Sequence, residues 1–307
     1  MTMATTTAPR TAVTGSPSGA ASGLTVTRAA HRHFGAGSVP LDQPVERVFF
    51  PDLARYSGIP CQEDVVRTGR GNTFEGMGLA LLSDLGEHGG DIDLLILAYS
   101  TPDLLPSKMT APALAELFPG SPLVLAVTDQ GRSAPFTALA LARGYALRHG
   151  FRRALVMAFD QSLLPYATPQ SDDQRIDGDG AVALLLEAGP DGSAGAGYQV
   201  RQTSGLAPER VPGELQRLLV ALAPEGSGLL LAGPGVDRDW VPPRAAASVR
   251  WAPAGYPCTA LLGGLAERLP AAGSGPVVLV EYDRALGDLS VCRIDPAASG
   301  RDQVGFR

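Results

Sequence analysis

Continuous apolar runs that alternate with helical segments constrain the fold of this chain more than any other feature. The runs Asp91–Ser100, Pro122–Asp129 and Arg153–Asp160 lack the alternation of a half-exposed strand, so they predict strands buried on both faces. Ser133–His149 has alanine and leucine at helical spacing, and Gly150 follows it as a helix-ending glycine. Strands and helices alternating at this spacing predict an α/β fold with a largely parallel sheet.

Further segments continue this pattern to the end of the chain. We predict helices at Thr110–Phe118, Glu209–Leu222 and Thr259–Leu269, and strands at Ala181–Glu187, Tyr198–Ser204, Gly228–Ala232, Pro276–Tyr282 and Leu289–Asp295. The last two strands are separated by a turn and predict a closing antiparallel hairpin.

The composition along the chain predicts two halves. Residues 1–23 are small and polar, show no hydrophobic periodicity and predict a disordered tail without a secretory signal. The glycine-rich stretch 189–197 predicts a linker. We therefore expect an N-terminal half at 24–188 and a C-terminal half at 198–307.

Charge and rare residue types exclude several functions. The net charge of −6 argues against nucleic-acid binding, and no apolar run approaches the roughly 18 residues of a membrane span. Cys61, Cys258 and Cys292 show no metal-binding spacing, and an odd, low count fits a reducing cytoplasm. Lys108 is the only lysine, so no phosphate-binding loop of the usual ATPase type exists.

Four ordered segments resemble the ketoacyl synthase III branch of the thiolase superfamily. Val66–Gly69 is similar to the early RTG signature, and Asp91–Ser107 resembles the family segment that ends in STPDxxxPS. Val124–Asp160 matches the nucleophile strand, its helix and the next strand, and Asp177–Glu187 resembles the FGDGAGAVVLE strand. The resemblance implies a thiolase-like five-layer α-β-α-β-α fold of two similar halves, dimeric through a sheet edge, that acts on acyl-carrier protein or acyl-CoA.

The family's catalytic triad is replaced at all three positions. With Phe136 setting the register, the position of the family's catalytic cysteine is occupied by Ser133. The family's histidine stretch corresponds to Gly233–Val236, and its asparagine position to Tyr256. All four histidines lie in the first half of the chain, and Asn72 is the only asparagine. Arg238–Pro253 is too short and proline-broken for the usual helix, so we expect an abbreviated C-terminal half.

Ser133 has two interpretations. It is either a nucleophile that accepts an acyl group or the N-cap of the following helix, because serine is a common N-cap at such junctions. Asp129, at the end of the preceding strand, is the candidate base, although capping its own loop is the alternative. Arg132 either contacts a phosphopantetheine arm or an acidic carrier, or is a solvated loop arginine.

The remaining candidates carry weaker signals. Cys258 lies on the loop where the family places its asparagine, so Cys258 either faces the substrate pocket with Tyr256 and Phe136 or is a small buried residue. His31 and His33 alternate on a strand, but zinc takes three or four protein ligands, so they predict no metal site. No cofactor is expected.

Two functions follow from these observations. In the first, the chain is a degenerate subunit of polyketide or fatty-acyl metabolism that forms a homo- or heterodimer with a ketoacyl synthase. In the second, it is an active acyltransferase that loads an acyl group on Ser133 without decarboxylative condensation. The missing histidine and asparagine remove the decarboxylation machinery in either case, so condensation by this chain alone is not expected. Of the two functions, the first is preferred.

Overall fold

The computed structural model describes residues 23–87, 90–166, 175–189, 197–269 and 275–295. In these ranges the chain forms two five-stranded sheets, ordered β1-β7-β6-β4-β5 and β10-β9-β11-β12-β8. The strands of the first sheet are β1 (Leu24–Phe34), β4 (Leu94–Tyr99), β5 (Leu123–Val127), β6 (Arg153–Asp160) and β7 (Asp179–Ala188). Those of the second are β8 (Tyr198–Thr203), β9 (Ser227–Ala232), β10 (Ala246–Trp251), β11 (Val277–Asp283) and β12 (Asp288–Ile294).

The two sheets have the same internal topology. In each, the first strand in sequence lies at one edge and pairs with the fifth, which pairs with the fourth, then the second, then the third at the other edge. In each sheet, the second, third and fourth strands in sequence are parallel to one another, and the remaining pairs are antiparallel. The described ranges therefore contain two similar halves that repeat one folding unit.

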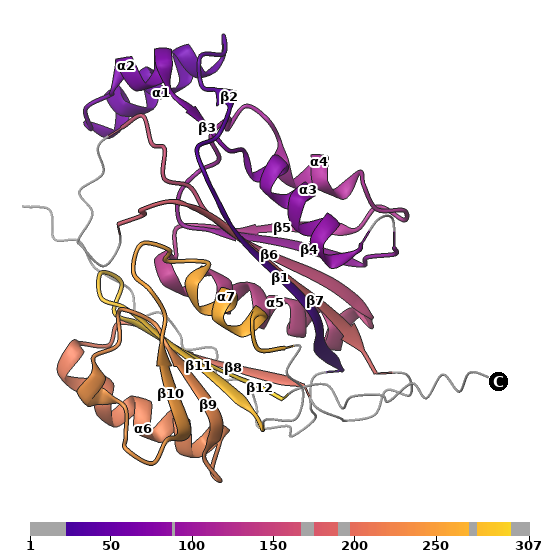
Figure 1. The fold of residues 1–307 in the computed structure, drawn as a ribbon, viewed down its shortest axis with the longest axis vertical. Helices are drawn as coiled ribbons and strands as arrows, with labels where there is room; N and C mark the ends of the chain where they lie inside the picture. The colour runs from indigo at the N-terminus through magenta and orange to yellow at the C-terminus, as the bar shows by residue number, and fades with distance from the viewer. Residues whose placement is uncertain (1–22, 88–89, 167–174, 190–196, 270–274, 296–307) are drawn as a thin grey trace, which may run out of the picture.

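The helices complete five layers (Figure 1). The middle layer holds α5 (Ala134–His149) and α7 (Ala260–Ala266), which contact both sheets. Helices α3 (Phe74–Leu85) and α4 (Thr110–Ala115) cover the outer face of the first sheet, and α6 (Val211–Leu222) covers the outer face of the second. The structure confirms the α-β-α-β-α arrangement expected from the sequence.

Strand β6 shows why these runs are apolar throughout. Its residues alternate between the central core beneath α5 and the outer core beneath α3. Ala154, Val156 and Ala158 pack centrally, whereas Leu155 and Met157 pack outward. Both faces of this strand exclude water, so no polar alternation appears in its sequence.

The expectation of a largely parallel sheet needs correction, because both sheets are mixed. Strands β1 and β7 run antiparallel to their neighbours in the first sheet, as do β8 and β12 in the second. An apolar run reports burial of both faces but not strand direction, since direction depends on the connection between strands. The predicted closing hairpin is present as β11 and β12.

The C-terminal half is abbreviated, as expected. Where the first half has α4 between β4 and β5, the second has only a short 3-10 turn, Arg238–Trp240, between β9 and β10. Helix α7 has 7 residues against 16 in α5. Strand β10 was not foreseen, because Ala246–Trp251 is an edge strand whose residues are mostly exposed and therefore lacks an apolar run.

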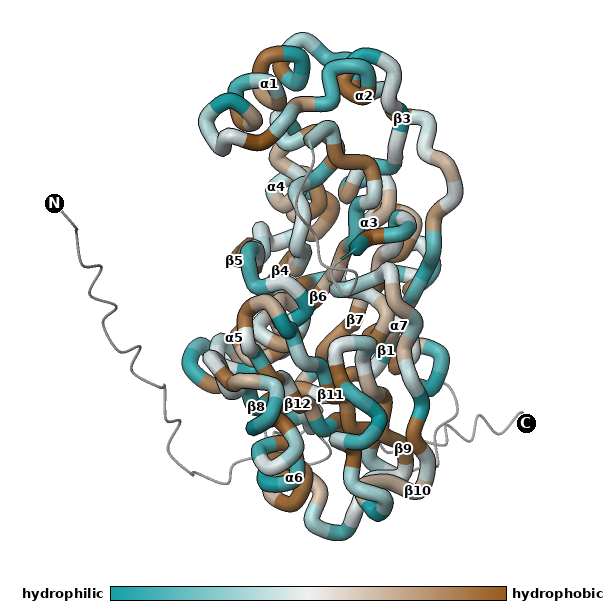
Figure 2. The backbone as a smooth tube through the Cα atoms, turned by 90° about the vertical axis from the view of Figure 1, so that its left-hand side faces the viewer, coloured by the Kyte–Doolittle hydropathy of each residue, from teal (hydrophilic) through white to brown (hydrophobic). Residues whose placement is uncertain are grey.

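A smaller unit lies beyond the first sheet, at the top of Figure 1. It contains α1 (Glu46–Ser57), α2 (Glu63–Thr68) and the short pair β2 (Val39–Pro40) and β3 (Arg70–Gly71). Figure 2 shows the hydrophobic segments running through the sheet strands while the loops are mainly hydrophilic. None of the helices in the described ranges is long and apolar enough to cross a membrane.

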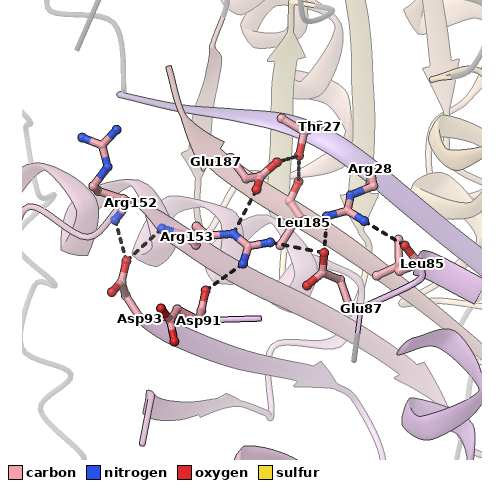
Figure 3. Close-up of polar contacts among 10 residues, drawn as sticks. All are labelled: Thr27, Arg28, Leu85, Glu87, Asp91, Asp93, Arg152, Arg153, Leu185 and Glu187. Carbon is pink, nitrogen blue, oxygen red and sulfur yellow. Dashed lines mark hydrogen bonds and ion pairs between the residues drawn. The ribbon is translucent and has the colours of Figure 1, made fainter. Parts of the chain in front are cut away.

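An ionic network holds one end of the first sheet (Figure 3). The carboxylate of Glu87 is 7% exposed and accepts hydrogen bonds from Arg28 of β1 and Arg153 of β6. Arg153 also donates to Glu187 of β7, at 2.9 Å. Because Arg153 begins β6 and Asp160 ends it, this network lies at the opposite end of the sheet from the N-terminus of α5.

The predicted tail and linker fall largely on residues 1–22 and 190–196, which lie outside the described ranges.

Candidate functional site

Ser133 lies at the N-terminus of α5, one loop after β5, as the sequence predicts. It ends a short 3-10 turn, Gly131–Ser133, and is 1% exposed. Phe136, which set the register of the comparison, is buried one helical turn further on, in the central core. The helix thus presents Ser133 at the boundary between the two halves of the fold.

The hydroxyl of Ser133 does not cap the helix. Ser133 is the N-cap residue of α5, as one of its two interpretations expects, but its side chain forms no capping hydrogen bond. Its described side-chain partner is Ser290 of β12, with the two Oγ atoms 3.3 Å apart. The Gln202 amide in turn donates to Ser290 Oγ, at 3.1 Å. The chain of hydrogen bonds therefore ends in an amide, which cannot accept the proton of a serine nucleophile.

The backbone donors around Ser133 are also engaged. The N–H of Arg132 donates to Asp283 Oδ2 at 3.0 Å, and that of Ser133 donates to the Gln130 carbonyl at 2.9 Å. The N–H of Ala134 donates to the Gly131 carbonyl. Stabilising an oxyanion requires free donors directed at the developing charge. These three N–H groups already have partners.

Asp129 does not approach Ser133. It is exposed and adopts a left-handed backbone with φ of 60°. Among the hydrogen bonds of the described residues, none joins Asp129 to Ser133. The general base suggested by sequence proximity is thus turned away, because the backbone reverses direction between the strand and the helix.

Two buried carboxylates instead bind the helix N-termini, each across the boundary between the halves. Asp283, which ends β11 of the second half, accepts from the Arg132 N–H that precedes α5. Asp160, which ends β6 of the first half, accepts from the N–H groups of Cys258 and Thr259, at 3.0 and 2.9 Å, before α7. Helix N-termini favour negative charge, so each carboxylate stabilises the start of a helix in the other half. The two contacts together hold the two halves against each other.

Gly131 makes the first of these contacts possible. A Cβ at this position would lie 2.1 Å from Asp283 Oδ2, and the residue has a positive φ of 47°. Only glycine therefore allows Asp283 to approach the start of α5.

Arg132 is the most unexpected residue of the site. It is 1% exposed, which excludes the solvated-loop interpretation, and its Nη1 lies 3.5 Å from Glu281 Oε2. Among the described residues, none of its three guanidinium nitrogens has a hydrogen-bond partner. A buried guanidinium usually forms several hydrogen bonds, so its position is set mainly by the charges of the surrounding carboxylates.

Burial dominates the acid–base properties of these carboxyl groups. It raises the pKa of Asp160 to about 6 and that of Glu281 to about 7, while the positive charge of Arg132 opposes both increases. One oxygen of Glu281, Oε1, accepts hydrogen bonds from the N–H groups of Gly235 and Tyr282, and the other, Oε2, faces Arg132. Glu281 is therefore a buried partner of Arg132 and not a free base.

Glu281 occupies the space beneath the loop after β9. A Cβ on Gly233 would lie 1.9 Å from Glu281 Oε2, so glycine is required there. The sequence resemblance aligns this loop with the histidine stretch of the family. Here it encloses a carboxylate from β11.

Cys258 and Tyr256, which precede α7, contact different segments of the first half. Cys258 is 2% exposed, with its Sγ 3.6 Å from the Gly131 carbonyl, and burial raises the pKa of its thiol well above the ordinary value. A buried, protonated thiol is a poor nucleophile. Tyr256 turns its ring toward His33, with the ring centroids 4.2 Å apart.

The described residues contain no group of three histidine, cysteine, aspartate or glutamate side chains that could hold a metal ion.

Sequence reasoning missed Asp160, Glu281 and Asp283 as members of this centre. Each lies at the end of an apolar strand run, Arg153–Asp160 or Val277–Asp283, and an acid embedded in such a run is a signal that could have been used. Their meeting with Arg132 could not be read from the sequence, because the contacts cross the boundary between the halves.

Two mixed sheets of identical topology around a shared helical layer define a thiolase-like fold. A scan against protein-family models finds no match, and neither does a search of the curated proteins. Solved structures do match. The chain is similar to the tetronic acid condensing enzyme AbyA1, at 16% identity and a TM-score of 0.58, covering 89% of this chain and 99% of that one.

Other solved structures share the fold. A 3-oxoacyl-(acyl-carrier protein) synthase from Burkholderia xenovorans LB400 matches at 17% identity and a TM-score of 0.57, covering 90% of this chain and 95% of its own. The acyltransferase ChlB3 matches at 17% identity and a TM-score of 0.58, covering 89% and 98%. The chain therefore has the fold of ketoacyl synthase III enzymes over nearly its whole described length.

Proposed function

We propose that this chain is a ketoacyl-synthase-III-like subunit of polyketide or fatty-acyl metabolism that does not itself catalyse decarboxylative condensation. It acts beside a competent synthase, on acyl groups carried by an acyl-carrier protein or by CoA. One observation carries the proposal: Ser133 has neither a base nor a free backbone donor among the described residues around it. The buried pair of Arg132 and Glu281 stands beside it instead.

The edge of the first sheet supports a partner subunit. Strand β5 pairs only with β4 within the described residues, so its other edge leaves backbone N–H and C=O groups without strand partners. Leu123 on this strand is 40% exposed, and Leu147 on the neighbouring α5 is 53% exposed. An apolar edge strand next to an apolar helix face fits another strand and helix of the same kind. We therefore assign this face to a second thiolase-like subunit.

The subunit contact is tested by co-expression with a competent ketoacyl synthase from the same pathway. We expect a stable complex whose product differs from that of the synthase alone. Leu147→Asp places a charge in the contact and should dissociate the complex, whereas Val220→Asp, on the exposed face of α6, should not. A complex that survives Leu147→Asp, or a product unchanged by this chain, contradicts the proposed role.

The catalytic part is tested with the purified chain and malonyl-carrier or malonyl-CoA. We expect no release of carbon dioxide above background, because the backbone N–H groups around Ser133 are already engaged and cannot form an oxyanion hole. Decarboxylation that is lost in Ser133→Ala would disprove the proposal.

The second candidate is an acyltransferase that forms an ester on Ser133. The absence of a capping bond from its hydroxyl favours this candidate, since that oxygen is not committed to the helix. Incubation with acyl-CoA should then add one acyl mass to the chain, and Ser133→Ala should abolish the addition. Ser248→Ala, at an exposed serine of β10, is the matched control. Absence of the added mass leaves the non-condensing subunit as the function.

A further inference from the structure

A pocket of about 190 Å³ lies along the side of the molecule where β1 and β10 form the edges of their sheets. It is bounded by β1, by α7, by β9 and by the end of β10, so it is separate from the β5 edge assigned above to a partner. Its polar lining consists of His31, His33, Arg250 and Glu267, and Trp251 adds an aromatic wall. This volume equals that of about six water molecules, at roughly 30 Å³ each in the liquid, so the pocket suits a small ligand.

The imidazole of His31, a polar group, lies half-buried in the wall of this pocket. It faces α7, and a Cβ on Gly263 would lie 2.7–2.9 Å from three atoms of the ring. Burial lowers the pKa of His31, with His33 lowering it further and Glu267 opposing the change, so the ring is neutral near pH 7. Its Nε2 is buried and has no hydrogen-bond partner among the described residues. A buried polar group without a partner is destabilising.

The internal repeat shows that the fold does not require this arrangement. The contacts of Arg132 with Asp283 and of Cys258 with Asp160 align Arg132 with Cys258, and therefore the next residues, Ser133 and Thr259, with each other. On this alignment Gly263 corresponds to Thr137 and Gly264 to Ala138. Helix α5 therefore forms the same layer without paired glycines, which weaken a helix.

The equivalent positions on α5 differ in chemistry as well. On the same alignment, Ala260, Leu261, Gly264 and Glu267 correspond to Ala134, Pro135, Ala138 and Leu141, so the acidic side chain has no counterpart there. The groove on α7 carries a cation, an anion and two imidazoles instead. The polar lining is thus a property of this one site and not of the repeated fold.

We propose that this pocket binds a small zwitterion with an apolar side chain, that is, an α-amino acid. Arg250 is the group that pairs with the carboxylate, and Glu267 the group that pairs with the ammonium. Trp251 contacts the apolar side chain. Arg250 and Glu267 carry opposite charges, so a ligand with one charge of each sign satisfies both residues together. A ligand with a single charge leaves one of them unmatched.

The proposal is tested by calorimetric titration of the full chain with three probes that share a phenyl ring. These are L-phenylalanine, 3-phenylpropanoate, which lacks the ammonium, and 2-phenylethylamine, which lacks the carboxylate. L-phenylalanine should bind at least tenfold more tightly than either of the others. Equal binding of 3-phenylpropanoate, or no binding of L-phenylalanine in the millimolar range, overturns the proposal.

Variants connect the binding to the pocket. Arg250→Met and Glu267→Gln should each weaken L-phenylalanine binding at least tenfold, and the exposed controls Arg201→Met and Glu225→Gln should leave it unchanged. Gly264→Leu should abolish binding, because its side chain fills the pocket. A Cβ at Gly264 makes only an ordinary 3.5 Å contact with Leu231, so this variant folds and its unfolding midpoint does not fall. Undiminished binding in Gly264→Leu refutes the assignment. The assay uses no acyl donor, so its outcome is independent of the function proposed for Ser133.

Discussion

Replacing Arg132 with methionine tests the charge balance at the centre of the molecule. Nη1 of Arg132 lies 3.5 Å from Glu281 Oε2, both side chains are at most 2% exposed, and the guanidinium also acts on Asp160. Methionine keeps much of the volume but removes the positive charge. Two buried carboxyl groups then lose the cation that favours their ionised forms.

The expected loss of stability depends on pH. Removing one partner of a buried ion pair costs about 3–5 kcal/mol, and we expect this loss for Arg132→Met at alkaline pH, where both carboxyl groups are ionised. Burial raises the pKa of Asp160 from 3.8 to about 6 and that of Glu281 from 4.5 to about 7. Without Arg132 both values rise further. Near pH 5 both groups are therefore protonated in the folded variant, and the loss should fall to about 1 kcal/mol.

The same pKa values predict the pH dependence of the unmodified protein. A raised pKa in the folded state means that folding favours the protonated carboxyl group. This stabilisation is complete below the ordinary pKa values, near 4, and is lost as the pH rises through about 6 and 7. At about 1.4 kcal/mol per pKa unit, each group contributes on the order of 3 kcal/mol. Glu281→Gln should remove about half of this dependence.

Urea unfolding followed by circular dichroism, at about pH 5 and about pH 9, measures these quantities. Arg201→Met, at an exposed arginine of β8, is the control and should change the stability by less than about 0.5 kcal/mol at either pH. A loss for Arg132→Met that is the same at both pH values would refute the reasoning, because it would show that the buried carboxyl groups do not respond to the arginine.

Other variants test the core and the ionic network by the same unfolding measurement. Phe136→Ala should cost about 3–5 kcal/mol by leaving a cavity in the central core, and a cost no larger than that of Phe49→Ala, at a side chain 40% exposed, would contradict its role. Glu87→Gln should cost about 1.5–3 kcal/mol by removing the charge shared by two arginines, whereas the exposed control Glu63→Gln should cost almost nothing. Tyr282→Phe should cost about 1 kcal/mol, since its hydroxyl donates to a buried carbonyl at 2.6 Å, and an unchanged stability would exclude that bond.

The sequence alone determined the arrangement of buried elements. A strand covered on both faces must be apolar at every position, so runs such as Arg153–Asp160 could be located almost to the residue. It also predicted, from a resemblance in order and spacing, that the family's cysteine, histidine and asparagine positions are changed. The position of Ser133 at the start of a helix followed from Phe136 and the strand before it.

The tertiary structure decided what surrounds Ser133. Asp129 is close to it in sequence but is turned into solvent by a left-handed backbone, whereas Ser290 and Asp283 come from a strand hairpin in the other half. Charge and burial at this centre depend on side chains that meet only when two sheets pack on a common helical layer. The apolar periodicity of the local sequence predicts the layers. It does not indicate which side chains contact one another across them. The pairing of Arg132 with Glu281 therefore exists only in the folded molecule, because packing of the two halves brings the side chains together and the low dielectric there strengthens their attraction.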